Sequence, residues 1–341
     1  MIQVKATQTL VDARSAERMS NATSAAHQQR DPDTGKWVHT LRQSGIGEFM
    51  ICPERFRRGL ASDFVSLDTD ASAVGTAVHL TIEDAIDLMM SDDVVLGADD
   101  MEGLFDHNWS MLQTHVKNPE GEWVTRSVAN PMEWVKRTPE AAALFGQRCV
   151  RRFADHTLPT LEPIATEIPF GPLPLYEDHQ RLIQVKGSID YFDAKLGVID
   201  WKSAGRKYAP WEKERWAIQP TVYMYAVRHM ISGLWGGDDQ VRSLPHLAGW
   251  QHQHSLLDMA DDEFTFIVYD DNGLKGGPPQ HVTVQRGREW DDWLRTQALS
   301  MVKLLETDLD QYPMNDQHAL CSASWCDHWA TCKGTTVDIG K

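Results

Sequence analysis

The sequence predicts an α/β fold that carries a helical insertion, and three features of the chain predict it. Short segments rich in β-branched and aromatic residues recur between residues 164 and 285, separated by turn residues. One long segment before them and one between them have apolar residues at helical spacing. Strands interleaved with helices in this order are typical of a sheet covered by helices.

The first half of the chain is predicted to be mostly helical. Residues 1–40 are polar with little periodicity, which indicates a mobile or weakly packed leader, and residues 41–341 are expected to form a single domain. The apolar spacing over Val74–Met90 predicts a helix that places Gly75, His79 and Glu83 on one face. Residues 91–160 are acidic with helical character, and we expect them to form the insertion.

Residues 161–286 are predicted to form the α/β core. A turn at Asp193–Gly197 suggests a hairpin, and Trp216–Met230 suggests a helix that tolerates Pro220 in its first turn. The expected strands are Ile164–Phe170, Leu182–Phe192, Gly197–Trp201, Leu247–His252, Glu263–Tyr269 and His281–Gln285. The last segment, 287–341, begins with an amphipathic helix over Trp290–Leu305 and ends in a group of three cysteines.

Composition and charge restrict the class of protein. With 42% hydrophobic and 24% charged residues, the chain resembles an ordinary soluble protein, and it has no apolar run long enough for a bilayer. We therefore expect a cytoplasmic protein without a membrane partner, whose cysteines serve as metal ligands or free thiols. The net charge of −16 argues against a simple DNA-binding module.

That charge is unevenly distributed along the chain. Residues 81–120 contain ten acidic residues and one lysine, whereas residues 181–216 contain eight basic and five acidic residues. The α/β core is therefore locally basic, as an enzyme acting on DNA requires. The role of the acidic segment is open: it could cap a groove, repel non-substrate duplex or contact a partner.

Two aspartates and a lysine follow one another on the predicted hairpin. Asp200 and Lys202 are two residues apart, so a strand points both to one face, and Asp190 lies across the hairpin. Two carboxylates at a strand end form a site suited to Mg²⁺ or Mn²⁺. The alternative is a surface ion pair, but the apolar flanking residues, Trp201 among them, favour a buried strand.

Four motifs resemble the RecB-like branch of the PD-(D/E)XK nuclease superfamily. They are Gly75-Thr-Ala-Val-His79, Gly187-Ser-Ile-Asp190, Val198-Ile-Asp-Trp-Lys202 and Gln219-Pro-Thr-Val-Tyr223, in the order that the family has. The resemblance implies a restriction-endonuclease-like core, with a mixed sheet flanked by helices.

The resemblance also implies roles for individual residues. His79, Asp190, Asp200 and the backbone carbonyl of Trp201 would hold Mg²⁺ or Mn²⁺, and Lys202 would be the catalytic lysine. Gln219 and Tyr223, one helical turn apart, would line the site and touch the DNA strand.

Two glutamates are candidates for auxiliary roles. Glu167 precedes Asp190 by one strand, and a solvated strand residue is the alternative reading. Glu83 lies one helical turn after His79, and we expect it to orient that histidine.

Four of the five cysteines stand at the two ends of the core: Cys52, Cys321, Cys326 and Cys332. Their spacing is a poor match to structural zinc. It resembles the iron–sulfur nucleases of the RecB-like branch, including AddB-type subunits and CRISPR-associated exonucleases, and Cys52-Pro53-Glu54-Arg55-Phe56 resembles their first-cysteine motif. The resemblance implies a structural [4Fe–4S] cluster that ties the C-terminal tail to the N-terminal helices; zinc or four unrelated thiols are the alternatives. Cys149 is expected to be a core thiol.

The expected function is a metal-dependent DNA exonuclease that acts on single-stranded DNA or DNA ends. The resemblance implies a context of recombination, repair or CRISPR spacer acquisition, in a host or phage, with proteins of those systems as partners. A DNA-end-binding assembly subunit with silent or secondary activity is the alternative, and a zinc-stapled DNA-binding protein is a third. Cleavage polarity and oligomeric state stay open, although homo-oligomers occur among such nucleases.

Overall fold

The computed structural model describes residues 26–60, 69–117, 123–126, 132–231, 263–271, 277–307, 311–315, 320–322, 326 and 328–332. The strand predicted at Leu247–His252 and most of the predicted leader lie outside these residues.

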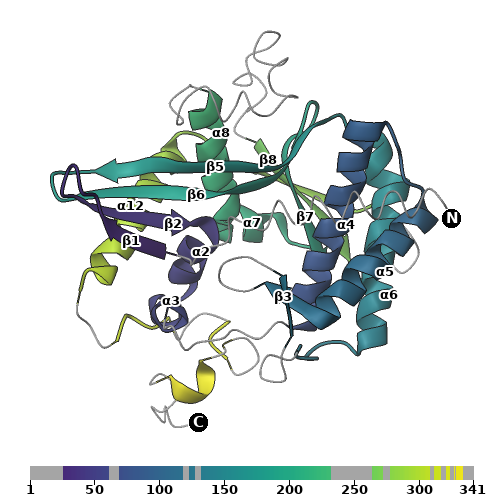
Figure 1. The fold of residues 1–341 in the computed structure, drawn as a ribbon, viewed down its shortest axis with the longest axis horizontal. Helices are drawn as coiled ribbons and strands as arrows, with labels where there is room; N and C mark the ends of the chain where they lie inside the picture. The colour runs from purple at the N-terminus through teal and green to yellow at the C-terminus, as the bar shows by residue number, and fades with distance from the viewer. Residues whose placement is uncertain are drawn as a thin grey trace.

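A seven-stranded mixed sheet forms the centre of the molecule (Figure 1). The strand order is β1-β2-β6-β7-β8-β9, and β5 pairs with the other edge of β6. The pairs β2–β6 and β7–β8 are parallel and the remaining pairs are antiparallel. The strands are β1 (Ala26–Arg30), β2 (Trp37–Arg42), β5 (Pro163–Glu177), β6 (Arg181–Asp193), β7 (Gly197–Ala204), β8 (Glu263–Asp270) and β9 (Gln280–Gln285).

The first two strands differ from the prediction for the N-terminus. Residues 26–42, most of which fall within the predicted leader, form β1 and β2, and β2 lies parallel to the start of β6. Val38 and Leu41 are buried in this strand, and these two apolar residues are its only strong sequence signal. A polar composition therefore did not prevent the segment from joining the sheet: β1 is the edge strand, and the buried Thr40 hydroxyl of β2 accepts a hydrogen bond from the Gln184 side chain at 2.8 Å.

Helices cover both faces of the sheet. They are α2 (Gln43–Ile51), α3 (Pro53–Gly59), α4 (Asp70–Asp92), α5 (Ala98–Thr114), α6 (Pro139–Arg152), α7 (Pro210–Trp216), α8 (Gln219–Ile231) and α12 (Glu289–Leu305). Local sequence explains several of their starts. The Thr69 hydroxyl accepts the Ser72 N–H at 3.3 Å as an N-cap, and Pro220 occupies the first turn of α8, where no helical N–H is needed.

The segment between α4 and β5 contains two further helices and a small ribbon. Helices α5 and α6 pack on α4, and β3 (His115–Lys117) pairs with β4 (Trp123–Thr125) in a separate two-stranded sheet. A π-helical turn (Phe153–Thr157) and a 3₁₀ turn (Leu158–Thr160) lead into β5. Gly146 allows the close approach of α5 and α6, since a Cβ there would lie 2.0 Å from the Phe105 ring.

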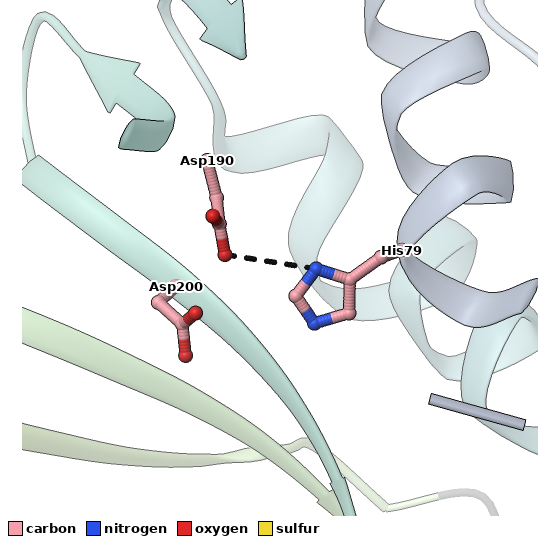
Figure 2. A group of neighbouring side chains, drawn as sticks. All are labelled: His79, Asp190 and Asp200. Atoms are coloured by element: carbon pink, nitrogen blue, oxygen red, sulfur yellow. Dashed lines mark ion pairs between the residues drawn. The ribbon is translucent and has the colours of Figure 1, made fainter. Parts of the chain in front are cut away.

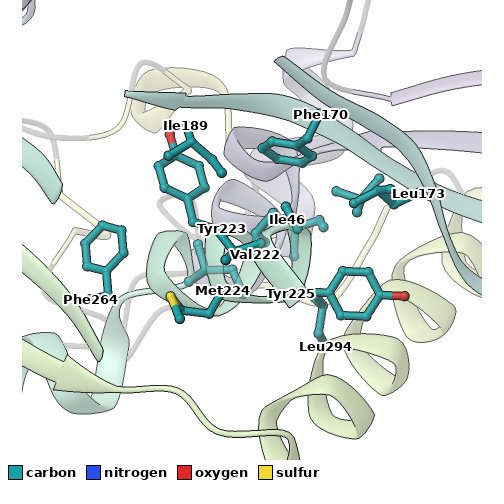
Figure 3. Packing of buried hydrophobic residues seen from close by; sticks show 14 of the residues in the cluster. Ile46, Phe170, Leu173, Ile189, Val222, Tyr223, Met224, Tyr225, Phe264 and Leu294 are labelled. Carbon is teal, nitrogen blue, oxygen red and sulfur yellow. The ribbon is translucent and has the colours of Figure 1, made fainter. Parts of the chain in front are cut away.

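Alternate residues of the central strands enter two separate hydrophobic cores. Val198 and Phe266 join the core formed with α8, α12 and α2, part of which Figure 3 shows. Their neighbours Ile199 and Ile267 join the core formed with α4, α5 and α6. Strands buried on both faces in this way give a three-layer α/β arrangement. None of the described helices is long and apolar enough to cross a membrane.

Candidate active site

The two predicted aspartates lie where β6 and β7 separate. The strands pair from Asp193–Gly197 to Tyr191–Ile199, and Asp190 and Asp200 come next on each strand. On the same edge of β6, pairing with β2 stops at Lys186. The Gly187–Asp190 motif therefore spans the gap between β2 and β7, which leaves the side chain of Asp190 accessible beside that of Asp200.

His79 reaches this fork from α4. Its Nδ1 lies 3.6 Å from Asp190 Oδ2 (Figure 2). Its Nε2 lies 2.5 Å from the carbonyl oxygen of Trp201. A carbonyl can only accept, so this contact requires the proton on Nε2. One ligand atom each from His79, Asp190 and Asp200 lies within 4.8 Å of the others. Three of the four groups expected to hold a metal therefore lie together, and the fourth, the Trp201 carbonyl, contacts His79.

Lys202 lies beside Asp200 on the same face of β7. Its Nζ is 2.7 Å from Asp200 Oδ2 and 2.9 Å from Oδ1, and the Asp200 side chain is fully buried. Burial alone would raise the pKa of Asp200, but the Lys202 charge and hydrogen bonds outweigh it and hold that pKa below its usual range. Burial likewise opposes the charge of Lys202, yet the two aspartates raise its pKa. The lysine therefore stays protonated.

Asp190 behaves differently from Asp200. Burial, followed by the charge of Asp200, raises the pKa of Asp190 well above its usual range. Burial also lowers the pKa of His79, against the attraction of Asp200. Two carboxylates this close favour sharing a proton unless a cation neutralises them.

Gln219 and Tyr223 link the two aspartates from α8. The Gln219 Nε2 donates to Asp200 Oδ1 at 2.7 Å and to the Tyr223 hydroxyl at 3.1 Å. That hydroxyl donates in turn to Asp190 Oδ1 at 3.1 Å. The spacing of four residues on a helix thus places both side chains over the strand fork.

Gly187 contributes to the position of Tyr223. A Cβ at Gly187 would lie 2.6 Å from the Phe170 ring, so only glycine leaves room for that ring. Phe170 packs edge-on against Tyr223, with ring centroids 6.1 Å apart (Figure 3). Gly187 therefore helps to position the Tyr223 hydroxyl, which donates a hydrogen bond to Asp190, the last residue of the same motif.

The residues at this fork fit a hard divalent cation. They offer one imidazole nitrogen, two carboxylates and one carbonyl oxygen. Asp200 Oδ2 is buried and has no well-aligned hydrogen-bond donor, although the Lys202 ammonium lies close to it. A buried carboxylate oxygen in this position is best satisfied by a cation.

The two auxiliary glutamates lie outside this cluster. The β5–β6 register places Glu167 opposite Asp190, with its Oε2 accepting from the Ser188 hydroxyl at 2.9 Å, and its charge contributes to the raised pKa of Asp190. Glu167 is exposed at the rim of the site. Glu83 is half-buried on α4, but both ring nitrogens of His79 face other groups. Its orienting role therefore stays a prediction.

The C-terminal tail contacts the helices around Cys52. The buried Glu54 carboxylate accepts from Arg57 and Arg58 at 2.7 to 2.9 Å and from the Tyr312 N–H at 2.8 Å. These donors outweigh its burial and lower the pKa of Glu54 to about 2. No local pattern in the sequence indicates that Glu54 links α3 to the C-terminal tail, because its partner Tyr312 is distant in the sequence.

Further contacts bring the cysteine-bearing segments together. The Asn315 side chain donates to the Ile51 carbonyl at 2.9 Å, and Arg58 donates to the Thr331 hydroxyl at 3.1 Å. The Cys332 sulfur lies 3.5 Å from that of Met314. Cys52, Cys321, Cys326 and Cys332 are partly exposed, and none of these four forms a disulfide. Cys149 is buried, and burial raises its pKa to about 12.

Comparison with known proteins identifies the family of the chain. The sequence matches the profile of the PD-(D/E)XK nuclease superfamily over residues 40–333. A search of curated proteins finds no match. The match covers most of the chain, from the end of β2 through β9 and α12, and it includes the His79–Asp190–Asp200–Lys202 cluster, so the chain belongs to the PD-(D/E)XK nuclease superfamily.

Proposed function

We propose that this protein is a metal-dependent deoxyribonuclease of the RecB-like branch, acting as an exonuclease on single-stranded DNA or DNA ends. The observation that carries the proposal is the convergence of His79, Asp190 and Asp200 with Lys202 beside them. Bound there, Mg²⁺ or Mn²⁺ would polarise a phosphodiester and supply a hydroxide nucleophile.

The protein's own groups would prepare the site for that chemistry. Lys202 keeps Asp200 ionised and presents an ammonium to the negative charge that develops on a phosphate. Tyr223 and Gln219 hold the two carboxylates in fixed positions through hydrogen bonds. Burial of the cluster strengthens each of these interactions.

The direct test is cleavage of end-labelled single- and double-stranded DNA with Mn²⁺, Mg²⁺ or EDTA. We expect trimming that needs the metal, is abolished in Lys202→Ala and survives in Lys303→Met, which removes a charge from the exposed face of α12. The product ladder would reveal the polarity. Binding of DNA ends without trimming would favour an assembly subunit, and trimming by Lys202→Ala would overturn the assigned site.

We further propose a structural [4Fe–4S] cluster held by Cys52, Cys321, Cys326 and Cys332. The contacts of Glu54, Arg58 and Asn315 with the tail support it, because they bring the two cysteine-bearing segments close together. Cysteines that bind metal instead of forming disulfides are typical of a reducing compartment, so we place the enzyme in the cytoplasm. Its partners would be DNA and the proteins of recombination, repair or CRISPR adaptation.

A further inference from the structure

A second lysine lies near the cluster and was not singled out by the sequence analysis. Lys213 is on α7, and it is half-buried. Its Nζ lies 3.8 Å from the centroid of the Tyr208 ring and 5.0 Å from that of Phe266. Phe266 is opposite Asp200 in the β7–β8 register, and the Lys202 ammonium is 6.0 Å from the same ring. The two ammonium groups therefore approach one aromatic ring from two different elements.

The backbone around Lys213 is firmly held. The buried Arg286 guanidinium donates to the carbonyls of Glu214 at 2.7 Å, Ala217 at 3.2 Å and Lys213 itself at 3.3 Å. The Gln280 side chain holds Tyr208 by accepting from its N–H and donating to its carbonyl, both at 2.8 Å. Both the helix that carries Lys213 and the Tyr208 residue beside its ammonium are therefore fixed, so little conformational entropy is lost when Lys213 binds a ligand.

Carboxylates near Lys213 are already paired with other cations. Asp200 pairs with Lys202, Glu212 with Arg206, and Glu214 with Arg286. Within the described residues Lys213 forms no ion pair. Burial and the Lys202 charge lower its pKa to about 8, so at neutral pH it is still mostly a cation. A half-buried cation without a carboxylate partner gains most from an anionic ligand.

We propose that Lys213 binds a phosphate of the nucleic-acid strand next to the phosphate at the Lys202 cluster. This inference rests on the proposed nuclease function and assigns Lys213 as a substrate-positioning residue. Its ammonium contacts the non-bridging oxygens of the neighbouring phosphate, while the Tyr208 ring fixes its direction. The strand thereby passes over α7 as it leaves the cluster.

The test compares Lys213→Met with wild type, because methionine keeps the packing on the aromatic rings and removes only the charge. Binding of a fluorescent single-stranded oligonucleotide is measured in EDTA over a series of salt concentrations. We expect Kd to rise about tenfold, with the slope of log K against log salt reduced by about 0.7. With metal present, KM should rise while kcat stays the same. Lys213→Arg should restore both, and Lys303→Met should match wild type.

The outcomes separate this inference from the nuclease proposal. If wild type cleaves and Lys213→Met binds with the same Kd and salt slope, Lys213 is not a phosphate contact and only this inference fails. A lower melting temperature with unchanged binding would assign Lys213 a packing role instead. If wild type neither binds nor cleaves DNA, the nuclease proposal fails, and this inference fails with it.

Discussion

Asp190 and Asp200 lie one position beyond the paired part of the β6–β7 hairpin, and their pKa values are shifted in opposite directions. Asp200 is ionised because Lys202 and Gln219 hydrogen-bond to it. Asp190 has its pKa raised by burial and by Asp200, and its donor is the Tyr223 hydroxyl. The site is therefore asymmetric before any cation binds, and the hydroxyl of Tyr223 is the group that orients its weaker acid.

Removing that hydroxyl should slow cleavage without unfolding the protein. Tyr223→Phe keeps the edge-on contact with Phe170 and loses the hydrogen bond to Asp190, so we expect the cleavage rate to fall about tenfold. Tyr225→Phe is the matched control, since Tyr225 lies on the same helix and its hydroxyl donates to the Pro174 carbonyl instead. Equal rates in the two variants would show that Tyr223 does not orient the site.

The positions of residues that belong to short motifs could be predicted from the sequence. His79, Asp190, Asp200, Lys202, Gln219 and Tyr223 all lie at the fork where the motifs placed them. Lys213 could not be predicted, because its position depends on the Tyr208 ring and on Arg286, more than seventy residues later. A lysine on a short polar helix has no local pattern that distinguishes it from a solvated one.

At the scale of elements, the packing of β5 against β6 helps to position the residues of the site. Phe170 on β5 fills the space above Gly187 on β6, and the β5–β6 pairing extends along most of β6. The hairpin of β6 and β7 was predicted from its turn residues. The parallel pairing of β2 with β6 was not, because it joins segments about 140 residues apart and half of the residues of β2 are polar.

The two motif glycines should respond differently to substitution by alanine. At Gly187 a Cβ would lie 2.6 Å from the Phe170 ring, so Gly187→Ala must displace that ring and with it Tyr223. We expect a loss of stability of about 1–3 kcal/mol and a reduced cleavage rate. Thermal unfolding and the cleavage assay measure the two effects.

Gly75 provides the contrast on α4. A Cβ there would meet Ser203 Oγ at 3.6 Å, an ordinary contact, and alanine favours a helix over glycine by about 1 kcal/mol. Gly75→Ala should therefore be as stable as wild type or more so, with normal cleavage. A destabilised Gly75→Ala protein, or an unaffected Gly187→Ala protein, would contradict this account of the packing.

At the scale of the whole molecule, the described part of the C-terminal tail packs against the helices before and after Cys52. Tyr312 and Asn315 contact Glu54 and Ile51, and Thr331 contacts Arg58, although more than 250 residues separate the members of each pair. In the sequence, only the cysteines indicated that the C-terminal tail meets the N-terminal helices. The contacts of Glu54 with the tail could not be predicted from any local pattern. Metal binding at such a contact would couple to folding.

Loss of one proposed ligand should therefore remove iron and lower stability together. Cys326→Ala purified without oxygen should lose its visible absorption and bound iron, and unfold at a lower temperature. Cys149→Ala is the control: its thiol is buried with a pKa near 12, so it is a poor ligand, and iron content should stay the same. If the wild type is colourless and contains zinc, the four cysteines form a zinc site and not an iron–sulfur cluster. If Cys326→Ala is as stable as the wild type, the cluster has no structural role.

The measurement that tests the central claim most directly is the binding of Mn²⁺ by electron paramagnetic resonance, comparing wild type with Asp200→Asn. Asp200 lies beside His79, Asp190 and Lys202, and its loss removes the carboxylate of this site whose pKa is held below its usual range. Asp178→Asn, in the turn between β5 and β6, serves as the control. We expect wild type and Asp178→Asn to bind Mn²⁺ and Asp200→Asn to bind it at least about tenfold more weakly. Equal binding by all three proteins would contradict the assignment of this fork as the metal centre.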